Sequence, residues 1–313
     1  MKLASYSKAP GKIIIAGEHF VVHGSRSLAA AIDKGILVKI NKSDKHEIYS
    51  NYGNRFIQIE KNTNQPISDL AKRTLEFIGV DESLKITIDS DIPNSSGLGS
   101  SSAVMVATVS AIGEFFNVNL TKTDIYNLAM SGEKSIHGNP SGVDVAASVY
   151  GGIISFRKGE NPTPVKMNSD LELIVIVSGI KRKTSILINK FTKVKSLSPN
   201  LFEAMLKSSD ILIGEMQDAL VSHNLQKIGA LMNFYNSCLS YYGLDHVTTD
   251  ELIDKSLSLG CYGSKITGAG GGGSVIAIAE KTKTSLITKQ INQYGYECFS
   301  IKLPQEGVKC WTD

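Results

Sequence analysis

A loop rich in glycine and serine, residues 93–102 (PNSSGLGSSS), stands directly before a long apolar segment. Glycines let backbone N–H groups approach an anion closely, and a helix that begins here would add unpaired donors and the positive end of its dipole. One of the serine hydroxyls could also bind Mg²⁺. The loop is not a Walker A sequence, because no lysine follows, and it is not a GxGxxG sequence. It is a candidate phosphate-binding loop, and a flexible turn with a serine cap is the alternative.

A second glycine-rich stretch, residues 265–274 (KITGAGGGGS), precedes a predicted strand. A dinucleotide-binding loop follows a strand and opens a helix, so that interpretation is disfavoured. The successive glycines favour close approach of the backbone to a ligand or to another loop. A plain linker is the alternative.

Two carboxylates, Glu133 and Asp144, lie on either side of a predicted turn at residues 137–142. Glu133 is at the end of one predicted helix. Ser141 and Asp144 have the spacing of a capping box, which places Asp144 in the first turn of the next helix, where the dipole keeps it ionised. Two carboxylates brought together by a rigid turn suit a metal ligand and a general base. The alternative is that Asp144 only caps its helix.

A short predicted strand carries Lys12 at one end and leads to Glu18 and His19 at the other. A single lysine is usually solvated and a single histidine is usually structural. These residues therefore indicate a site only together with the other segments.

The elements around these segments form a β-rich opening followed by helices. Residues 100–116 are too numerous for a strand and are apolar nearly all round, which indicates a buried helix. Thr121 and Asp124 have the form of a capping box, so another helix should begin there and continue to about Lys134. Further strands are predicted at residues 12–16, 28–32, 36–40, 46–49, 55–59, 84–90 and 153–156, and further helices at 68–77 and 145–150.

Residues 158–166 (KGENPTPVK) are polar and contain two prolines, which is typical of a linker. A second α+β pattern follows. Its predicted strands are residues 171–177, 274–279 and 297–302, and its predicted helices are 185–194, 201–223, 225–242, 250–259 and 283–294. We therefore expect two α+β domains, residues 1–160 and 161–313.

Three of these segments, PGKIIIAGEH, PNSSGLGSSSA and KITGAGGGGS, resemble the three motifs of the GHMP kinase family, in the same order and over nearly the whole chain. The family includes kinases of galactose, homoserine, mevalonate and phosphomevalonate. The segments GEHFVVHG and EKSIHGNPSGVDVAASVYGG are most similar to those of the members that act on mevalonate, whereas galactokinases continue with an HTDYN-like sequence.

The resemblance implies a two-domain α+β fold, the GHMP kinase fold. Its N-terminal ATP-binding domain would be like ribosomal protein S5 domain 2, with a left-handed βαβ unit, and its C-terminal domain would be ferredoxin-like. The active site would lie between them. ATP would be the phosphate donor, and mevalonate would be phosphorylated on its primary 5-hydroxyl to give 5-phosphomevalonate and ADP, in isoprenoid biosynthesis.

The matching positions also imply roles. Ser101 and Glu133 would hold Mg²⁺, Asp144 would be the catalytic base and Lys12 would lie beside it. The residues implied for ATP are Pro93, Ser96, Gly97, Leu98, Gly99, Ser100, Ser101 and Ser102, and those implied for the acceptor are Glu18, His19, Arg182, Thr184 and Gly270.

Some positions depart from the family pattern. Ser102 replaces the usual alanine, Val104 a tyrosine of the animal enzymes, and Ser274 the usual cysteine. Lys181 and Lys183 flank Arg182 where the animal enzymes have uncharged residues. These differences leave nucleotide preference and the shape of the pocket open.

Other functions remain as alternatives. A sibling kinase would act on homoserine or on phosphomevalonate, and the extra lysines around Arg182 could favour the phosphorylated acceptor. A related ATP-dependent decarboxylase would depart from the arrangement of Lys12 and Glu133. A non-catalytic ligand sensor would lose a base or a metal ligand, and this chain has both.

The composition bears on several classes of protein function. The 313 residues are 42% hydrophobic and 20% charged, with a net charge of +3 that is spread along the chain, so a nucleic-acid partner is not expected. No stretch is long and apolar enough for a membrane span, and residues 1–10 lack the apolar block of a signal peptide. The dispersed cysteines have no zinc-ligand spacing and suggest reduced thiols in the cytoplasm. The resemblance favours a homodimer.

Overall fold

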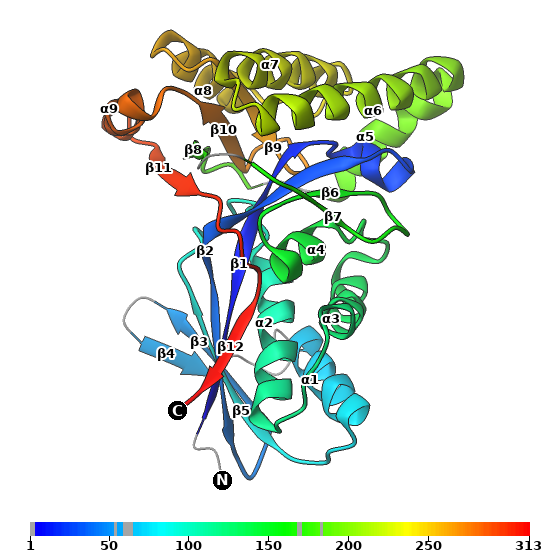
Figure 1. Ribbon diagram of the computed structural model, residues 1–313, viewed down its shortest axis with the longest axis vertical. Helices are drawn as coiled ribbons and strands as arrows, with labels where there is room; N and C mark the ends of the chain where they lie inside the picture. The colour runs from blue at the N-terminus through cyan, green and yellow to red at the C-terminus, as the bar shows by residue number, and fades with distance from the viewer. Residues whose placement is uncertain (1–3, 53–54, 59–64, 168–170, 182–183) are drawn as a thin grey trace.

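The computed structural model describes residues 4–52, 55–58, 65–167, 171–181 and 184–313, which form two sheets with helices packed on them (Figure 1). Within this part of the chain, the first sheet has the order β12-β1-β2-β5-β3-β4, and β2 also pairs with β6, which pairs with β7. Its strands are β1 (Ser5–Ala16), β2 (Ser27–Lys42), β3 (Glu47–Tyr52), β4 (Arg55–Gln58), β5 (Leu84–Ser90), β6 (Ile153–Phe156), β7 (Thr163–Val165) and β12 (Lys309–Thr312).

The two longest strands, β1 and β2, run antiparallel with a register shift between Pro10 and Lys12. A bulge of this kind changes the direction of the following side chain and is common next to active sites. The sequence predicted two strands at residues 28–32 and 36–40, but β2 is continuous through both. Gly35 does not form a turn there. A Cβ on Gly35 would be 2.4 Å from the carbonyl oxygen of Ala9, so the glycine permits close approach of β1.

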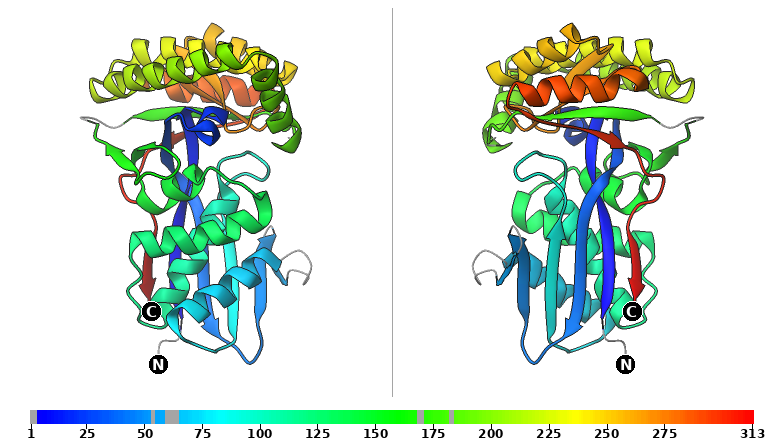
Figure 2. Two further views of the ribbon diagram at one scale, coloured as in Figure 1. Left: turned by 90° about the vertical axis from the view of Figure 1, so that its right-hand side faces the viewer. Right: turned by 90° about the vertical axis from the view of Figure 1, so that its left-hand side faces the viewer.

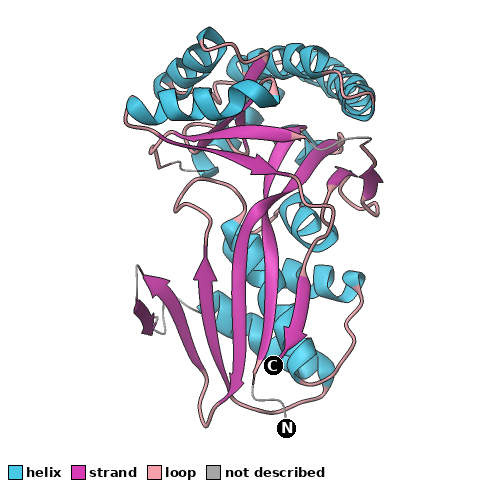
Figure 3. Cartoon of the chain, turned by 60° about the vertical axis from the view of Figure 1, so that its left-hand side comes forward, coloured by secondary structure: helices cyan, strands magenta, loops and turns pink. Residues whose placement is uncertain are grey.

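Helices cover one face of the first sheet, and its other face shows only strands (Figures 2 and 3). The central helix α2 carries small and branched apolar residues on nearly all of its sides, and it is buried as its sequence predicted. These helices are α1 (Gln65–Ile78), α2 (Ser100–Phe115), α3 (Lys122–His137) and α4 (Val143–Tyr150).

The second sheet has the antiparallel order β11-β8-β10-β9. A hairpin joins β9 to β10, while helices lie between β8 and β9 and between β10 and β11. This is the ferredoxin-like arrangement that the resemblance implied. The elements are β8 (Glu172–Val177), β9 (Gly263–Thr267), β10 (Ser274–Ile278), β11 (Glu297–Lys302), α5 (Thr184–Leu197), α6 (Pro199–Val221), α7 (Leu225–Tyr241), α8 (Val247–Ser258) and α9 (Lys281–Gln293).

Two further predictions were wrong. Residues 158–166 are not only a linker, because β7 forms there and pairs with β6, with Val165 opposite Ile153. Ser141 does not cap α4. The N-cap is Gly142, in the left-handed conformation with φ 92°, and no side chain caps this end. The expected position of Asp144 in the first turn of α4 is confirmed. The domain division after residue 160 stays a prediction, and β12 returns from the end of the chain to pair with β1.

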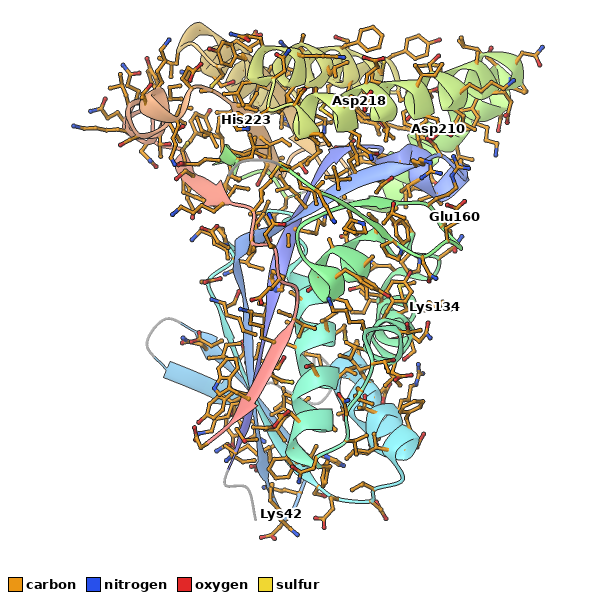
Figure 4. All side chains as sticks on the ribbon, viewed as in Figure 1. Lys42, Lys134, Glu160, Asp210, Asp218 and His223 are labelled. Atoms are coloured by element: carbon orange, nitrogen blue, oxygen red, sulfur yellow. The ribbon has the colours of Figure 1, made fainter. Side chains whose placement is uncertain are left out.

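Helix α6 also contacts the first half of the chain. Its Asp210, labelled in Figure 4, accepts hydrogen bonds of 2.7 Å from the hydroxyl of Ser25 and from the backbone N–H of Arg26. The guanidinium of Arg157, just after β6, pairs with the other carboxylate oxygen at 2.7 Å. Among the helices that the structure describes, none has the length and apolar composition of a membrane span.

Candidate active site

A cavity of about 710 Å³ lies where the two halves of the chain meet. Its walls include most of the loop at residues 93–102, the turn between α3 and α4, and the start of η1 (His19–His23), a short 3₁₀ helix after β1. Gly268 and Ala269, from the hairpin between β9 and β10, complete one side. Segments that are far apart in the sequence therefore share one site.

Within the candidate phosphate-binding loop, Gly99 is the N-cap of α2 and has φ 80°. No side chain caps this helix, so its first N–H groups are available to a ligand. A Cβ on Gly99 would be 2.8 Å from Cγ of Lys12, and the position therefore requires glycine for both reasons. The second glycine-rich segment supports this loop, because the buried hydroxyl of Ser274 donates to the carbonyl oxygen of Ser96 at 2.8 Å.

Glu133, in the last part of α3, contacts the start of α2. Its Oε1 accepts hydrogen bonds of 2.9 Å from the hydroxyls of both Ser101 and Ser102. Burial raises the pKa of the Glu133 carboxyl, and the nearby charge of Asp144 raises it further, while the Ser101 hydroxyl works in the opposite direction. The Nε2 atom of His137 is 3.6 Å from the other carboxylate oxygen. The structure therefore joins the two residues implied for the metal ion.

Lys12 connects the phosphate loop to the second carboxylate. Its Nζ donates to the carbonyl oxygen of Gly97 at 3.3 Å and is 3.2 Å from Oδ2 of Asp144. The lysine side chain is only 3% exposed, whereas that of Asp144 is 40% exposed. A cation and a carboxylate accessible from the cavity thus lie together beside the loop. This arrangement can deprotonate a hydroxyl and stabilise the oxygen that results.

Glu18 and His19 form another wall of the cavity. The ring of His19 stacks on Phe191 with centroids 5.2 Å apart, and its Nε2 is 2.9 Å from the carbonyl oxygen of Ala269. Glu18 makes a buried ion pair with Lys265 of β9. The sequence analysis did not predict a role for Lys265. The available signal was a single charged residue in the segment GSKIT, which forms the short strand β9 but was interpreted as part of a loop.

The remaining predicted residues do not all lie on the cavity. Leu98 is fully buried in the core, and it contributes a carbonyl oxygen that accepts from the backbone N–H of Lys12 at 2.8 Å. Gly270 is not among the residues that line the cavity, and a Cβ added to it would be 2.3 Å from the carbonyl oxygen of Leu244. Arg182 and the side chain of Thr184 lie outside the described residues, whereas the neighbouring Lys181 lines the cavity.

The donor set is compatible with Mg²⁺. The charge of Asp144 raises the pKa of the buried Glu133 carboxyl, and a bound cation would relieve the repulsion between the two carboxylates. Magnesium in phosphotransfer sites is usually bound by one or two carboxylates, with water and substrate phosphates as the other ligands. The hydroxyl of Ser101 adds a further oxygen at the start of α2.

Known proteins are similar to this chain over both of its halves. Residues 65–152 match the model of the GHMP kinases N terminal domain, and residues 216–297 match that of the GHMP kinases C terminal domain. A mevalonate kinase of Aeropyrum pernix is 30% identical over 99% of this chain and 99% of its own. The chain belongs to the GHMP kinase family. The family and the two-domain fold implied by the three motifs are therefore confirmed.

Solved structures place this GHMP kinase near the same relatives. The L. major mevalonate kinase in complex with R-mevalonate superposes with a TM-score of 0.83 at 26% identity, covering 95% of each chain. The Methanococcus jannaschii mevalonate kinase gives 0.82 at 27% identity, covering 97% of this chain and 98% of its own. The similarity covers nearly the whole chain and so includes both sheets.

Proposed function

We propose that this GHMP kinase transfers the γ-phosphate of ATP to the primary 5-hydroxyl of mevalonate, giving 5-phosphomevalonate and ADP. The observation that carries the proposal is the contact between Lys12 and Asp144, 3.2 Å apart beside the phosphate loop. The support for mevalonate as acceptor is the similarity, over nearly full length, to proteins named mevalonate kinase.

Asp144 is the proposed general base. It accepts the proton of the acceptor hydroxyl while the oxygen bonds to the γ-phosphorus and the bond to the β-phosphate oxygen breaks. The electron pair of that bond leaves with ADP. Lys12 stabilises the negative charge on the attacking oxygen, and its position near Gly97 holds the reacting oxygen next to the phosphate loop.

The loop at residues 93–102 is the proposed site of the ATP phosphates. Its N–H groups and the positive end of α2 attract their charge. Ser101 and Glu133 are the residues that would hold Mg²⁺, which supplies charge neutralisation on the phosphates. Glu133 is nearly inaccessible to solvent, so water competes poorly for its carboxylate.

A coupled assay of ADP release tests the function. Mevalonate, phosphomevalonate, homoserine and galactose are offered separately at the same ATP and Mg²⁺ concentrations. We expect mevalonate to give the highest kcat/KM. Preference for another acceptor would contradict the assignment of the substrate. If no acceptor gave ADP release, kinase activity toward these alcohols would be contradicted.

Phosphomevalonate is the second candidate acceptor. The observation that favours it is Lys181, an exposed cation on the cavity wall that could attract a phosphate. The same assay separates the two substrates. A higher kcat/KM with phosphomevalonate would assign the chain to that reaction.

Arg182 is proposed as the partner of the mevalonate carboxylate, helped by the Thr184 hydroxyl. Arg182→Ala should raise the mevalonate KM by roughly 10- to 100-fold, the scale of losing a charge-assisted pair. Arg182→Lys should recover only part of this loss, because an ammonium does not reproduce the planar fork. The KM for ATP is the internal control and should stay constant. Equal mevalonate KM values in all three proteins would show that Arg182 belongs to a solvated basic turn.

We also propose a cytoplasmic location, where ATP is available, and a homodimer, which the family resemblance favours. Helices α6 and α7 expose large apolar side chains suited to an interface, such as Ile211 and Phe234. Light scattering of the eluted protein gives the mass directly. A single species of 33.8 kDa would exclude the dimer.

A further inference from the structure

A charge pair lies completely inside the protein next to the cavity. Lys265, in the middle of β9, and Glu18, directly after β1, have side chains that are 0% and 1% exposed. Transfer of two charges from water to such a site costs so much that apolar residues of similar size are often equally stable there. The pair is therefore poorly explained by stability alone.

The two partners differ in how completely they are hydrogen-bonded. The ammonium of Lys265 uses its three protons, on Oε1 of Glu18 and on the carbonyl oxygens of Ile14 and Ile266. Within the described residues, Oε2 of Glu18 is buried and has no hydrogen-bond partner. Glu18 is also one of the residues that line the cavity. The pair thus leaves one acceptor oxygen of a cavity-lining residue without a partner among the described residues.

The surroundings determine the charge of this acceptor. Burial raises the pKa of Glu18, and the charges of Lys265 on β9 and Lys12 on β1 oppose that rise. Tyr235 of α7 also faces the pair, with the Lys265 ammonium 5.6 Å from its ring centroid, and burial raises the pKa of its phenol. Lys265 is the stronger of the two cationic influences on Glu18, so its loss should favour the protonated carboxyl.

We propose that Lys265 is a positioning residue for the substrate that accepts the phosphate. Lys265 acts through Glu18, whose carboxylate it keeps ionised and oriented on the cavity wall so that it can accept a hydrogen bond from that substrate. The proposal rests on the proposed kinase function and deepens it. Lys265 belongs to the second sheet and Glu18 follows the strand that carries Lys12. Correct packing of β9 against β1 is therefore coupled to the shape of the acceptor site.

The same strand provides a matched control. Two residues after Lys265, the buried Thr267 also joins β9 to β1, because its hydroxyl accepts from the N–H of Ile14 at 2.9 Å and donates to its carbonyl oxygen at 3.1 Å. Thr267→Val removes these bonds between the sheets and does not touch Glu18. Lys265→Met keeps a long apolar side chain and removes the ammonium.

The first measurement compares steady-state constants of the two variants. Lys265→Met should raise the acceptor KM by about 10-fold or more, the scale of a lost charge-assisted hydrogen bond, with the ATP KM unchanged. Thr267→Val should lower the melting temperature and leave the acceptor KM near that of the wild type. Similar changes in both variants, affecting ATP and acceptor together, would show that Lys265 only joins the sheets.

A double-mutant cycle with Glu18→Gln tests whether Lys265 acts through Glu18. We expect Glu18→Gln and the double variant Glu18→Gln/Lys265→Met to have the same acceptor KM, because no carboxylate remains to be positioned. A further rise in the double variant would overturn the proposal. The comparison of Glu18→Gln with the double variant does not use Lys265→Met, so it also stands if that single variant does not fold.

The pH profile gives a readout that a purely structural role would not change. As the pH is lowered, the kcat/KM for the acceptor should begin to fall at a higher pH in Lys265→Met than in the wild type. The reason is that Glu18 without its ammonium neighbour takes up a proton at higher pH. An unchanged profile would contradict the proposal. All arms use the acceptor that the wild type phosphorylates most efficiently. Failure with mevalonate therefore contradicts the proposed substrate, whereas failure of the cycle contradicts the role of Lys265.

Discussion

The Asp144→Asn variant is expected to lose about 10²-fold or more in kcat, because an amide cannot take up the proton of the acceptor hydroxyl. Asp144 is in the first turn of α4, where the helix dipole favours its charge, and it pairs with the ammonium of Lys12. The KM for ATP should change little, since the carboxylate lies outside the phosphate loop. Initial rates with both substrates varied measure the two effects separately.

A matched control is available in the preceding helix. Asp124 is also a first-turn aspartate, and its carboxylate accepts a hydrogen bond of 2.9 Å from the N–H of Thr121 in a capping box. Asp124→Asn should lower the thermal stability and leave kcat close to the wild-type value. Wild-type turnover by Asp144→Asn, or an equal loss in Asp124→Asn, would refute the assignment of the base.

Local patterns in the sequence were sufficient for elements whose pattern is strong. The strands Leu84–Ser90 and Ile153–Phe156 begin and end as predicted, and α2 ends within one residue of its predicted end. Leu84–Ser90 alternates between apolar and polar residues, Ile153–Phe156 is a short, mostly apolar segment after two glycines, and α2 is a long apolar run after a glycine-rich loop. The information that determines these elements lies within the segment itself.

Other elements depend on partners that are distant in the sequence. β12 is a short strand with exposed residues, and it forms because Trp311 and Cys310 pair with Tyr6 and Ser7 of β1. β9 was missed because its glycine, serine, lysine and threonine have no strand pattern. Its backbone is paired by β10 and by the side chain of Asn233 on α7, which bonds to Ser264.

The candidate site was predictable to the extent that motifs carry it. Lys12, Glu133 and Asp144 came from motifs, and the structure places them around one cavity. Lys265 could not be assigned in this way, because its partner Glu18 lies 247 positions earlier and no local pattern identifies a buried ion pair. Gly270 was assigned to the acceptor from its motif alone, and its role there stays a prediction.

The second large effect is expected in Glu133→Gln. The uncharged amide would bind Mg²⁺ poorly, so the Mg²⁺ concentration for half-maximal rate should rise at least about 10-fold, since even outer-shell changes cost 10- to 100-fold in metal affinity. The rate at saturating Mg²⁺ should also fall, by about 10²-fold, the usual scale of lost electrostatic stabilisation. Titration of the initial rate with Mg²⁺ at fixed ATP measures both quantities.

Variants of two neighbouring serines can distinguish a metal ligand from a residue that only donates a hydrogen bond to Glu133. Ser101 and Ser102 both donate to Oε1 of Glu133 at 2.9 Å, but Ser102 is almost fully buried. Ser101→Ala should raise the Mg²⁺ requirement, whereas Ser102→Ala should leave it near the wild-type value. An equal shift in both variants would mean that the hydroxyls act only by orienting Glu133. An unchanged titration in Ser101→Ala and Glu133→Gln would remove both residues from the metal site.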